Sequence, residues 1–313
     1  MSNSFSGPLD DPAADAGWQE SQPRKGFFTD TSVCIGCKAC EVACKEWNGI
    51  PEDGLNMLGS SYDNTGALSA STWRHVAFIE QPARSVEPAV QAEPSRATVG
   101  LGMPAVGLPG DSMDPATATD FRWLMSSDVC KHCTHAACLD VCPTGALFRT
   151  EFGTVVVQDD ICNGCGYCVP ACPFGVIDRR MGDENTKNVG IAQKCTLCYD
   201  RLGAGDTPAC AQACPTESIQ FGDVEELRER AAARLATVQG QGAAGARLYG
   251  EDPGDGVGGS GAMFLLLDEP EVYGLPPDPV VTTKDLPEMW KKAALAAVGL
   301  LAGAAAAFLG GRP

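Results

Sequence analysis

The chain of 313 residues has little positive charge and few histidines. It carries 23 Lys and Arg against 40 Asp and Glu, which gives a formal net charge of −17, and it has 3 His. A protein that binds nucleic acid presents clustered Lys and Arg to the phosphates. The sequence therefore predicts no nucleic-acid partner. Wholesale disorder is excluded as well, because 44% of the residues are hydrophobic.

Motifs of catalysis are also missing. There is no Ser-His-Asp arrangement and no fingerprint for binding a pterin or a flavin. The Gly-rich run 256–259 lacks the Lys-Ser/Thr pair that follows a phosphate-binding loop. Residues 1–22 contain neither the apolar stretch of a secretory signal nor a twin-Arg pair. We predict that the chain alone is not an enzyme and has no catalytic residue.

Cysteine, by contrast, is abundant and regularly spaced. The 16 Cys fall into four groups of four, and none is left over. In chain order the groups are Cys34, Cys37, Cys40 and Cys44; Cys130, Cys133, Cys138 and Cys142; Cys162, Cys165, Cys168 and Cys172; and Cys195, Cys198, Cys210 and Cys214.

Disulfides and zinc are the two simpler explanations of such spacing. Cysteines three residues apart in repeated triplets cannot all reach distant disulfide partners without crowding, and no secretory signal is present. A zinc site normally joins two Cys-x2-Cys pairs across a long gap. Three cysteines followed closely by a fourth supply one thiolate too many for that scheme, so both explanations are disfavoured.

Iron–sulfur clusters explain the spacing better. The run Cys-x2-Cys-x2-Cys-x3-Cys-Pro is typical of two-cluster ferredoxins, in which three thiolates bind one cluster and the fourth binds the other. Residues 162–173 match this run fully, and Pro143 and Pro215 follow the second and fourth groups, whereas Lys45 follows the first. Gly36, Gly164 and Gly166 allow the tight turns that a loop around a cluster needs. Sixteen thiolates predict four [4Fe-4S] clusters, with every Cys bound to iron and none acting as a nucleophile.

The order of the groups along the chain predicts an α+β fold with two nested ferredoxin-like domains. The fourth group needs the first as its partner, so the unit that contains the second and third groups is inserted between them. The predicted parts are a mobile tail at 1–27, a first half-unit at 28–120 with a Pro-rich insertion at 81–119, the inserted unit at 121–189, and a second half-unit at 190–287.

Periodicity adds four elements that carry no chemistry of their own. Alternation or an apolar run predicts strands at 73–79, 154–157 and 263–267. Helical spacing predicts a helix at 223–239, with Asp223 as N-cap and Glu226 at the third position of the helix.

Several polar residues lie among the cysteines. The lysines at positions 38, 45, 131 and 194 could raise local redox potentials, but residues of this kind more often belong to solvated faces, which is the interpretation favoured here. His132 and His135 suggest a Rieske centre. Four cysteines already complete that site, however, so both are expected at the surface or just behind the ligands.

The end of the sequence differs from the rest. Residues 293–309 contain no charge and would span about 25 Å as a helix, against a hydrocarbon core of about 30 Å. Trp290, Lys291 and Lys292 precede this stretch as interface anchors do. We predict a single membrane anchor at 288–313. The small residues Gly299, Gly303 and Ala307 would form one stripe on this helix, which predicts a helical partner in the membrane.

With these motifs in hand, the sequence resembles the iron–sulfur beta subunit of membrane-bound formate dehydrogenase, of the respiratory N and O type. The resemblance covers about residues 28–310 and rests on residues 32–48, 163–174, 194–198, 208–215, 249–259 and 274–276, together with the terminal apolar helix. The Pro-rich insertion at 81–119 is a departure from it.

The resemblance implies which cysteines share a cluster. We refer to these groupings as sets A to D. They are set A, Cys34, Cys37, Cys40 and Cys214; set B, Cys44, Cys195, Cys198 and Cys210; set C, Cys130, Cys133, Cys138 and Cys172; and set D, Cys142, Cys162, Cys165 and Cys168.

The resemblance also implies the partners. A catalytic alpha subunit with molybdenum or tungsten pterin would oxidise formate, and this chain would relay the electrons to a cytochrome b gamma subunit in the membrane, where quinone is reduced. The globular part would lie on the outer face of the cell membrane, as part of a hetero-oligomer. The alternatives left open are the same role in a hydrogenase or another molybdopterin oxidoreductase, and a soluble polyferredoxin.

Overall fold

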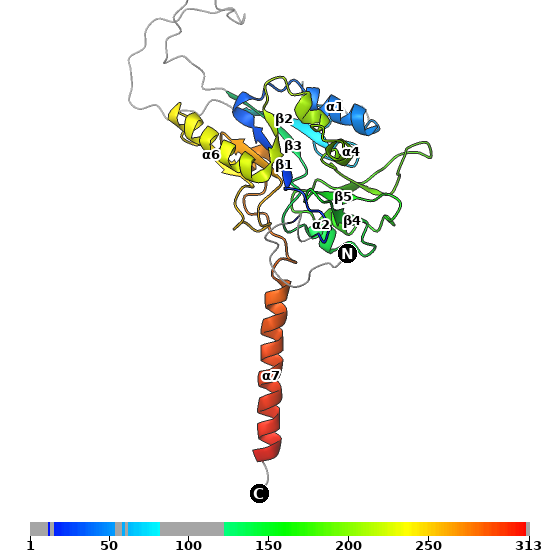
Figure 1. Ribbon diagram of the computed structural model, residues 1–313, viewed down its shortest axis with the longest axis vertical. Coiled ribbons are helices and arrows are strands. Elements are labelled where there is room, and N and C mark those ends of the chain that lie inside the picture. The colour runs from blue at the N-terminus through cyan, green and yellow to red at the C-terminus, as the bar shows by residue number, and fades with distance from the viewer. Residues whose placement is uncertain (1–11, 13–15, 54–57, 60–61, 82–121, 311–313) are drawn as a thin grey trace, which may run out of the picture. The chain divides into compact units, whose positions relative to one another are not determined.

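The computed structural model describes residue 12 and residues 16–53, 58–59, 62–81 and 122–310 (Figure 1). Nearly all of the Pro-rich insertion at 81–119 and about half of the predicted tail at 1–27 lie outside the described residues. By compactness the chain divides into two units, Met1–Phe78 with Met125–Pro313, and Ile79–Leu124. The structure is a mixture of helices and strands, which confirms the α+β prediction.

A four-stranded sheet forms the main layer. Its strands are β1 (Lys25–Asp30), β8 (Ile219–Asp223), β9 (Arg247–Tyr249) and β10 (Ala262–Leu266), in the order β8-β1-β10-β9. The central pair, β1 and β10, is parallel, and the outer strands are antiparallel to their neighbours. All five residues of β10 are buried and apolar, as expected for a strand covered on both faces.

Strand β1 corrects the predicted tail at 1–27. It begins at Lys25, and the side chains of Phe27 and Phe28 are fully buried. Phe28 joins the core under the helix, whereas the Phe27 ring packs edge-on against Phe221. The two aromatic residues therefore fix one strand in the middle of the sheet, and the boundary of the tail lies before residue 25.

Helix α6 (Val224–Gly240) covers one face of this sheet (Figure 1). Its buried side chains include Leu227 and Ala231, and they meet Met263 and Leu265 from β10 in one apolar cluster. The helix predicted at 223–239 is confirmed. Its predicted cap is wrong in detail: Asp223 holds the N-cap position, but its carboxylate pairs with Lys25 and makes no capping hydrogen bond.

The remaining elements are mostly short, and the cysteines lie in the loops between them and in the helices α1, α2, α3 and α5. They are η1 (Thr31–Val33), α1 (Ala39–Asn48), β2 (Arg74–Gln81), β3 (Arg122–Val129), α2 (Ala137–Asp140), β4 (Leu147–Arg149), β5 (Val155–Val157), α3 (Cys168–Ala171), β6 (Asp178–Arg179), β7 (Ala192–Gln193), α4 (Tyr199–Gly203), α5 (Ala209–Gln212) and η2 (Pro270–Tyr273). Strand pairs β2-β3, β4-β5 and β6-β7 form three small sheets. Helix α1 packs against α5, and α2 packs against α3.

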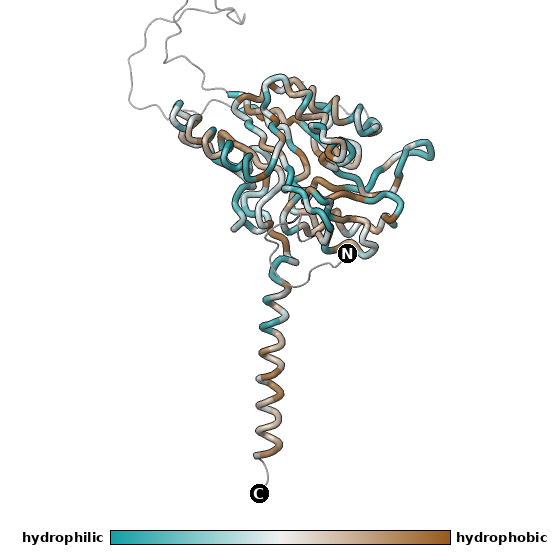
Figure 2. Tube along the Cα trace, viewed as in Figure 1, coloured by the Kyte–Doolittle hydropathy of each residue, from teal (hydrophilic) through white to brown (hydrophobic). Residues whose placement is uncertain are grey.

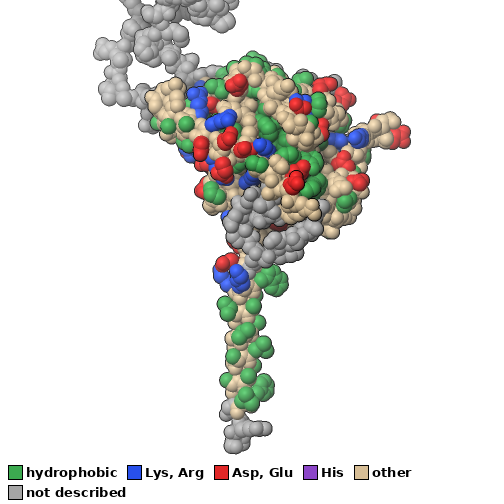
Figure 3. Space-filling model, viewed as in Figure 1, with side chains coloured by type: hydrophobic (Ala, Val, Ile, Leu, Met, Phe, Trp, Pro, Cys, Tyr) green, Lys and Arg blue, Asp and Glu red, His purple; other side chains and the backbone are tan. Residues whose placement is uncertain are grey.

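The last element is α7 (Leu286–Gly310), a helix long and apolar enough to cross a membrane. No part of its apolar window, Glu288–Leu309, is buried. Figure 2 shows hydrophilic colouring only where the helix begins and pale to brown colouring along the rest of it, and Figure 3 shows charged side chains where it begins. The terminal helix predicted from the sequence is confirmed.

The contact between α6 and the sheet gives a test of the fold. Leu227 is fully buried, so Leu227→Ala should lower the free energy of unfolding by about 2–5 kcal/mol. Glu229→Ala, an exposed position on the same helix, should change it by less than about 0.5 kcal/mol. Denaturation followed by circular dichroism measures both. Equal losses would show that α6 does not pack as described.

Candidate metal centres

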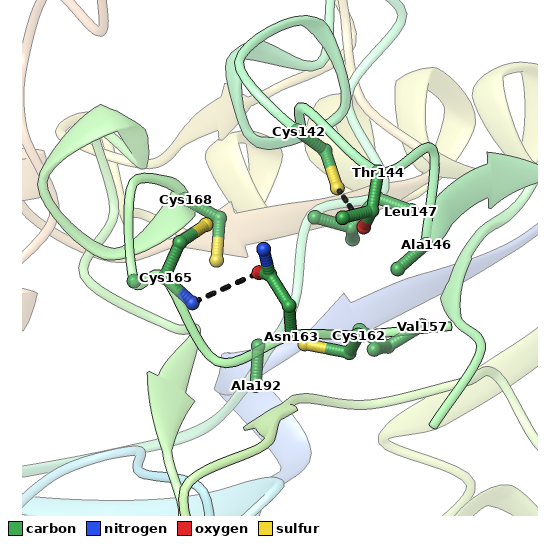
Figure 4. Close-up of a pocket in the computed structure, with 11 residues that line it drawn as sticks. Cys142, Thr144, Ala146, Leu147, Val157, Cys162, Asn163, Cys165, Cys168 and Ala192 are labelled. Atoms are coloured by element: carbon green, nitrogen blue, oxygen red, sulfur yellow. Dashed lines mark hydrogen bonds between the residues drawn. The ribbon is translucent and has the colours of Figure 1, made fainter. Parts of the chain in front are cut away.

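The cysteine side chains gather around small apolar cavities. Figure 4 shows the first, which is lined by the four cysteines of set D together with Leu147 and Val157. A second cavity is lined by all four cysteines of set A and by Val76 and Ile219. A third is lined by all four cysteines of set C and by Phe174 and Ile177. Each cavity thus draws thiols from two separate stretches of the chain.

The cysteines of set B come together where α1 packs against α5. Cys44 lies on α1 and Cys210 on α5, and both are buried. Burial raises the pKa of the Cys44 thiol well above its usual value, and repulsion from Cys195, Cys210 and Cys198 raises it further. The other three thiols of set B therefore lie near the Cys44 thiol.

The thiols fit a cluster better than the two simpler explanations. All sixteen cysteines are free, which contradicts a disulfide framework. Among the described residues, no three His, Cys, Asp or Glu side chains converge closely enough to hold a single metal ion, as a zinc site requires. Four thiols that surround a cavity without converging on one point suit a larger inorganic group, and thiolates are the ligands that iron–sulfur clusters take.

A shared backbone turn shapes the four loops. In the first Cys-x2-Cys segment of each group the residue just before the second cysteine has positive φ: Gly36 (65°), His132 (43°), Gly164 (70°) and Leu197 (57°). Glycine adopts this conformation without strain, whereas His and Leu do so at a cost. The sequence indicated the turn only at the two glycines. His132 and Leu197 occupy the same position in their Cys-x2-Cys segments as the two glycines do, and this shared position could have predicted the turn at both residues.

Burial makes the thiols hard to ionise. Desolvation raises the pKa of Cys40 and of Cys168 to about 11, and that of Cys138 to about 12. Cys142 is the exception: burial opposes ionisation there too, but hydrogen bonds from the backbone at Leu147 and from Thr144 lower its pKa. Since thiolates are the form that binds iron, most of these sites need positive charge or N–H donors nearby.

Buried cations meet part of this need, and here the sequence interpretation was wrong. Lys131 and Lys194 are only 1% and 2% exposed, and both line the cavity of set C. The Lys194 ammonium donates to the carbonyl oxygens of Val155 and of Cys195, the latter at 3.0 Å. The Lys131 ammonium lies over the rings of Phe174 and Phe264, so neither lysine belongs to a solvated face.

The other two lysines are only partly exposed. The Lys38 ammonium pairs with Asp63 at 3.2 Å, and the Lys45 ammonium pairs with Asp53 at 3.0 Å. These ion pairs tie the first cysteine loop to the segment that precedes β2. They hold the loop in place at the rim of the set A cavity, of which Lys38 is a lining residue.

His132 lies behind the ligands and not at the surface. Its side chain is buried, lines the set C cavity, and its Nδ1 accepts a hydrogen bond from the backbone N–H of Val155 at 3.1 Å. Burial and the positive charge of Lys194 lower its pKa well below the usual value, so the ring is neutral. His135 is half-buried, and its backbone N–H donates to the carbonyl oxygen of Val257 at 2.8 Å.

The turn at Gly164 gives a test of how tightly these loops are packed. A Cβ at Gly164 would lie 2.5 Å from the carbonyl oxygen of Gly190, whereas a Cβ at Gly175 would meet nothing within 4 Å. Both glycines have positive φ, so the strain from φ is common to the two alanine variants. Gly164→Ala should therefore cost at least about 1 kcal/mol more stability than Gly175→Ala in thermal unfolding. Equal midpoints would mean that the close approach does not exist.

Comparison with known proteins agrees with this chemistry. One family described as a 4Fe-4S dicluster domain matches residues 33–146, and another of the same description matches residues 121–224. Two such domains and sixteen cysteines are consistent with four [4Fe-4S] clusters.

The most informative relatives are subunits of formate dehydrogenase. The chain is 36% identical over 279 residues to the nitrate-inducible iron-sulfur subunit of Escherichia coli (strain K12), which covers 87% of this chain and 79% of that protein. It is 38% identical over 290 residues to the formate dehydrogenase-O iron-sulfur subunit of the same organism, covering 91% and 81%. The iron-sulfur subunit of Haemophilus influenzae is 39% identical over 256 residues, covering 80% and 68%. The chain therefore belongs to the family of formate dehydrogenase iron–sulfur subunits.

Proposed function

We propose that this chain is the electron-transfer subunit of a membrane-associated formate dehydrogenase complex. Formate dehydrogenase iron–sulfur subunits align with it over most of both sequences, and the two dicluster matches cover all of its cysteines. In this role the chain accepts electrons from a catalytic subunit that contains a molybdenum or tungsten pterin. It passes them to a cytochrome b subunit in the membrane.

Each cysteine set is proposed to hold one cluster. The residues are those of sets A, B, C and D, and each set combines three thiols from one loop region with one from another. When bound, the clusters supply one-electron carriers. The chain's own part is to fix the thiolates, to exclude water with side chains such as Val76, Leu147 and Ile177, and to direct N–H groups and cations towards sulfur.

The four sets are proposed to form a row in the order A, B, C, D. Burial is the main reason that the pKa values of Cys40, Cys195 and Cys138 are raised, but repulsion from a thiol of the neighbouring set adds to each of them. The thiol pairs that repel one another are Cys40 with Cys210, Cys195 with Cys130, and Cys138 with Cys168. These pairs join set A to B, B to C, and C to D, so consecutive sets are neighbours and an electron path can run through the whole row.

Exposure indicates where such a row would open to partners. Among the cysteines, Cys37 in set A and Cys165 in set D are exposed, whereas all four cysteines of set B are buried. Apolar side chains stand near both exposed thiols: Ile35 is 58% exposed, and Tyr167 is 62% exposed. We infer that one end receives electrons from the catalytic subunit and the other passes them on.

Helix α7 is proposed to anchor the complex in the cell membrane. It is long and apolar enough to cross, and Trp290 and Lys292 near its start are exposed, as interface anchors are. Gly299 and Gly303 would let a helix of the cytochrome subunit approach closely.

We further propose that the globular part lies on the outer face of the membrane, as the family resemblance implies. Protease treatment of intact cells tests this side directly.

The same relay in another molybdopterin oxidoreductase is the second candidate. One subunit of the anaerobic dimethyl sulfoxide reductase of Escherichia coli (strain K12) is 30% identical over 206 residues, covering 66% of this chain and 76% of that protein. The higher identity to the formate dehydrogenase subunits favours the first candidate. The catalytic subunit that co-purifies with the chain distinguishes the two.

Removal of one proposed ligand tests the cluster assignment. Cys162→Ser should lower the iron content by up to one cluster per chain, or convert that cluster, and should change the electron paramagnetic resonance (EPR) spectrum of the reduced protein. Ile161→Ala, an exposed neighbour, should leave both unchanged. An unaltered iron content and spectrum in Cys162→Ser would remove that residue from set D.

The absence of formate oxidation by this chain alone gives a separate test of its role as an electron-transfer subunit. The purified chain alone, loaded with iron, should oxidise no formate with an artificial dye as acceptor, because its sequence carries no catalytic motif and no fingerprint for a pterin or a flavin. The complex isolated through a tag on this chain should oxidise formate readily. Significant turnover by the chain alone would overturn its assignment as an electron-transfer subunit.

A further inference from the structure

Arg74 is a buried cation at the start of β2 that the ligand assignment does not use. It is 1% exposed, and its Nη1 donates to the carbonyl oxygen of Ser127 at 3.2 Å and to the hydroxyl of Ser127 at 3.1 Å. The guanidinium carbon lies 4.7 Å from the centre of the Phe27 ring. These contacts hold the planar group in one orientation in the interior.

The surroundings of Arg74 belong to two cysteine sets. The Ser127 hydroxyl that accepts from Arg74 also lies 3.3 Å from the sulfur of Cys40 in set A. Burial alone would lower the pKa of Arg74, but the thiols Cys210, Cys40, Cys195 and Cys44 outweigh it and raise the pKa above the usual value. One of these thiols is in set A and three are in set B. Arg74 therefore carries its positive charge near thiols of both sets.

Half of the guanidinium has no partner within the protein. Nε and Nη2 of Arg74 are buried and make no hydrogen bond, and among the described residues Arg74 forms no ion pair with a carboxylate. Lys194 offers a contrast, because two carbonyl oxygens accept from its ammonium. A buried charged group with unpaired N–H donors is costly. Arg74 thus has both a charge and donors left for a group that the thiols bind.

We propose that Arg74 is a positioning residue that raises the reduction potentials of the two clusters held by sets A and B. With the clusters bound, its Nε–H and Nη2–H would be free to donate to their sulfur, and its charge would stabilise the reduced state, which carries one more negative charge than the oxidised state. Both effects are strong in a dry interior of low dielectric constant. The proposal rests on the ligand sets proposed above.

A purely structural role for Arg74 makes a different prediction. If the residue only braces β2 against Ser127, its loss would weaken folding without a selective effect on two of the four potentials. The potentials therefore separate the two roles, which stability measurements cannot do.

The test is a redox titration followed by EPR on the complex as isolated. Arg74→Met removes the charge and the donors. We expect two of the four midpoint potentials to fall and the other two to stay at their native values. The matched control is Arg180→Met, another buried arginine (3% exposed) with an unpaired Nε, whose Nη2 donates to the carbonyl oxygen of Ala70 at 2.9 Å. This control should leave all four potentials unchanged.

A second measurement covers the case in which Arg74→Met does not assemble. The complex is labelled with ¹⁵N-arginine, and the reduced clusters are examined by pulsed EPR for hyperfine coupling to ¹⁵N. The native protein should show this coupling, and Arg74→Lys, which keeps the charge but not the guanidinium, should lose it. Absence of the coupling in the native protein would overturn the proposal.

The outcomes also distinguish failure of the role proposed for Arg74 from failure of the proposed ligand sets. Four unchanged potentials in a fully loaded Arg74→Met protein would overturn the role of Arg74 and leave the four clusters in place. A native chain with fewer than four clusters would instead contradict the ligand sets themselves.

Discussion

The structure depends on the burial of many thiols that must be ionised to bind metal. Desolvation raises the pKa of most of them, to about 12 at Cys138, so a thiolate in these cavities needs compensation. The fold supplies it locally, through backbone N–H groups beside Cys142 and through buried cations such as Lys194 and Arg74. The chain has a net charge of −17 and only 23 Lys and Arg, yet it buries several of these basic residues, including Lys194 and Arg74.

Secondary structure serves this arrangement in two ways. The sheet built on β1 and β10, with α6 packed on it, provides an apolar core that does not depend on the cysteines. The shorter helices and the loops beside them then carry the thiols, and the pairs α1 with α5 and α2 with α3 bring distant cysteine groups together. The nested ferredoxin-like division proposed from the sequence follows the same two helix pairs.

The sequence predicted what is periodic and could not predict what depends on tertiary packing. Cysteine spacing, the apolar run of β10 and the spacing of Leu227 and Ala231 in α6 are all local patterns. The burial of Lys131 is not, because it follows from contacts with residues distant in sequence, such as the rings of Phe174 and Phe264. The positive φ of His132 and Leu197 could not be predicted from residue type either, because His and Leu disfavour this conformation. Only their position within the cysteine motif indicates it.

The central claim is that every thiol binds one of four clusters. This chain then transfers electrons, and another subunit oxidises formate. Mössbauer spectroscopy of the ⁵⁷Fe-loaded complex, combined with iron and sulfide counts, tests it most directly. Once the iron of any other subunits is subtracted, the account predicts four irons and four sulfides for each of the four cysteine sets, all with the spectrum of [4Fe-4S] clusters. A missing cluster, or iron in this chain in a mononuclear or three-iron form, would contradict it.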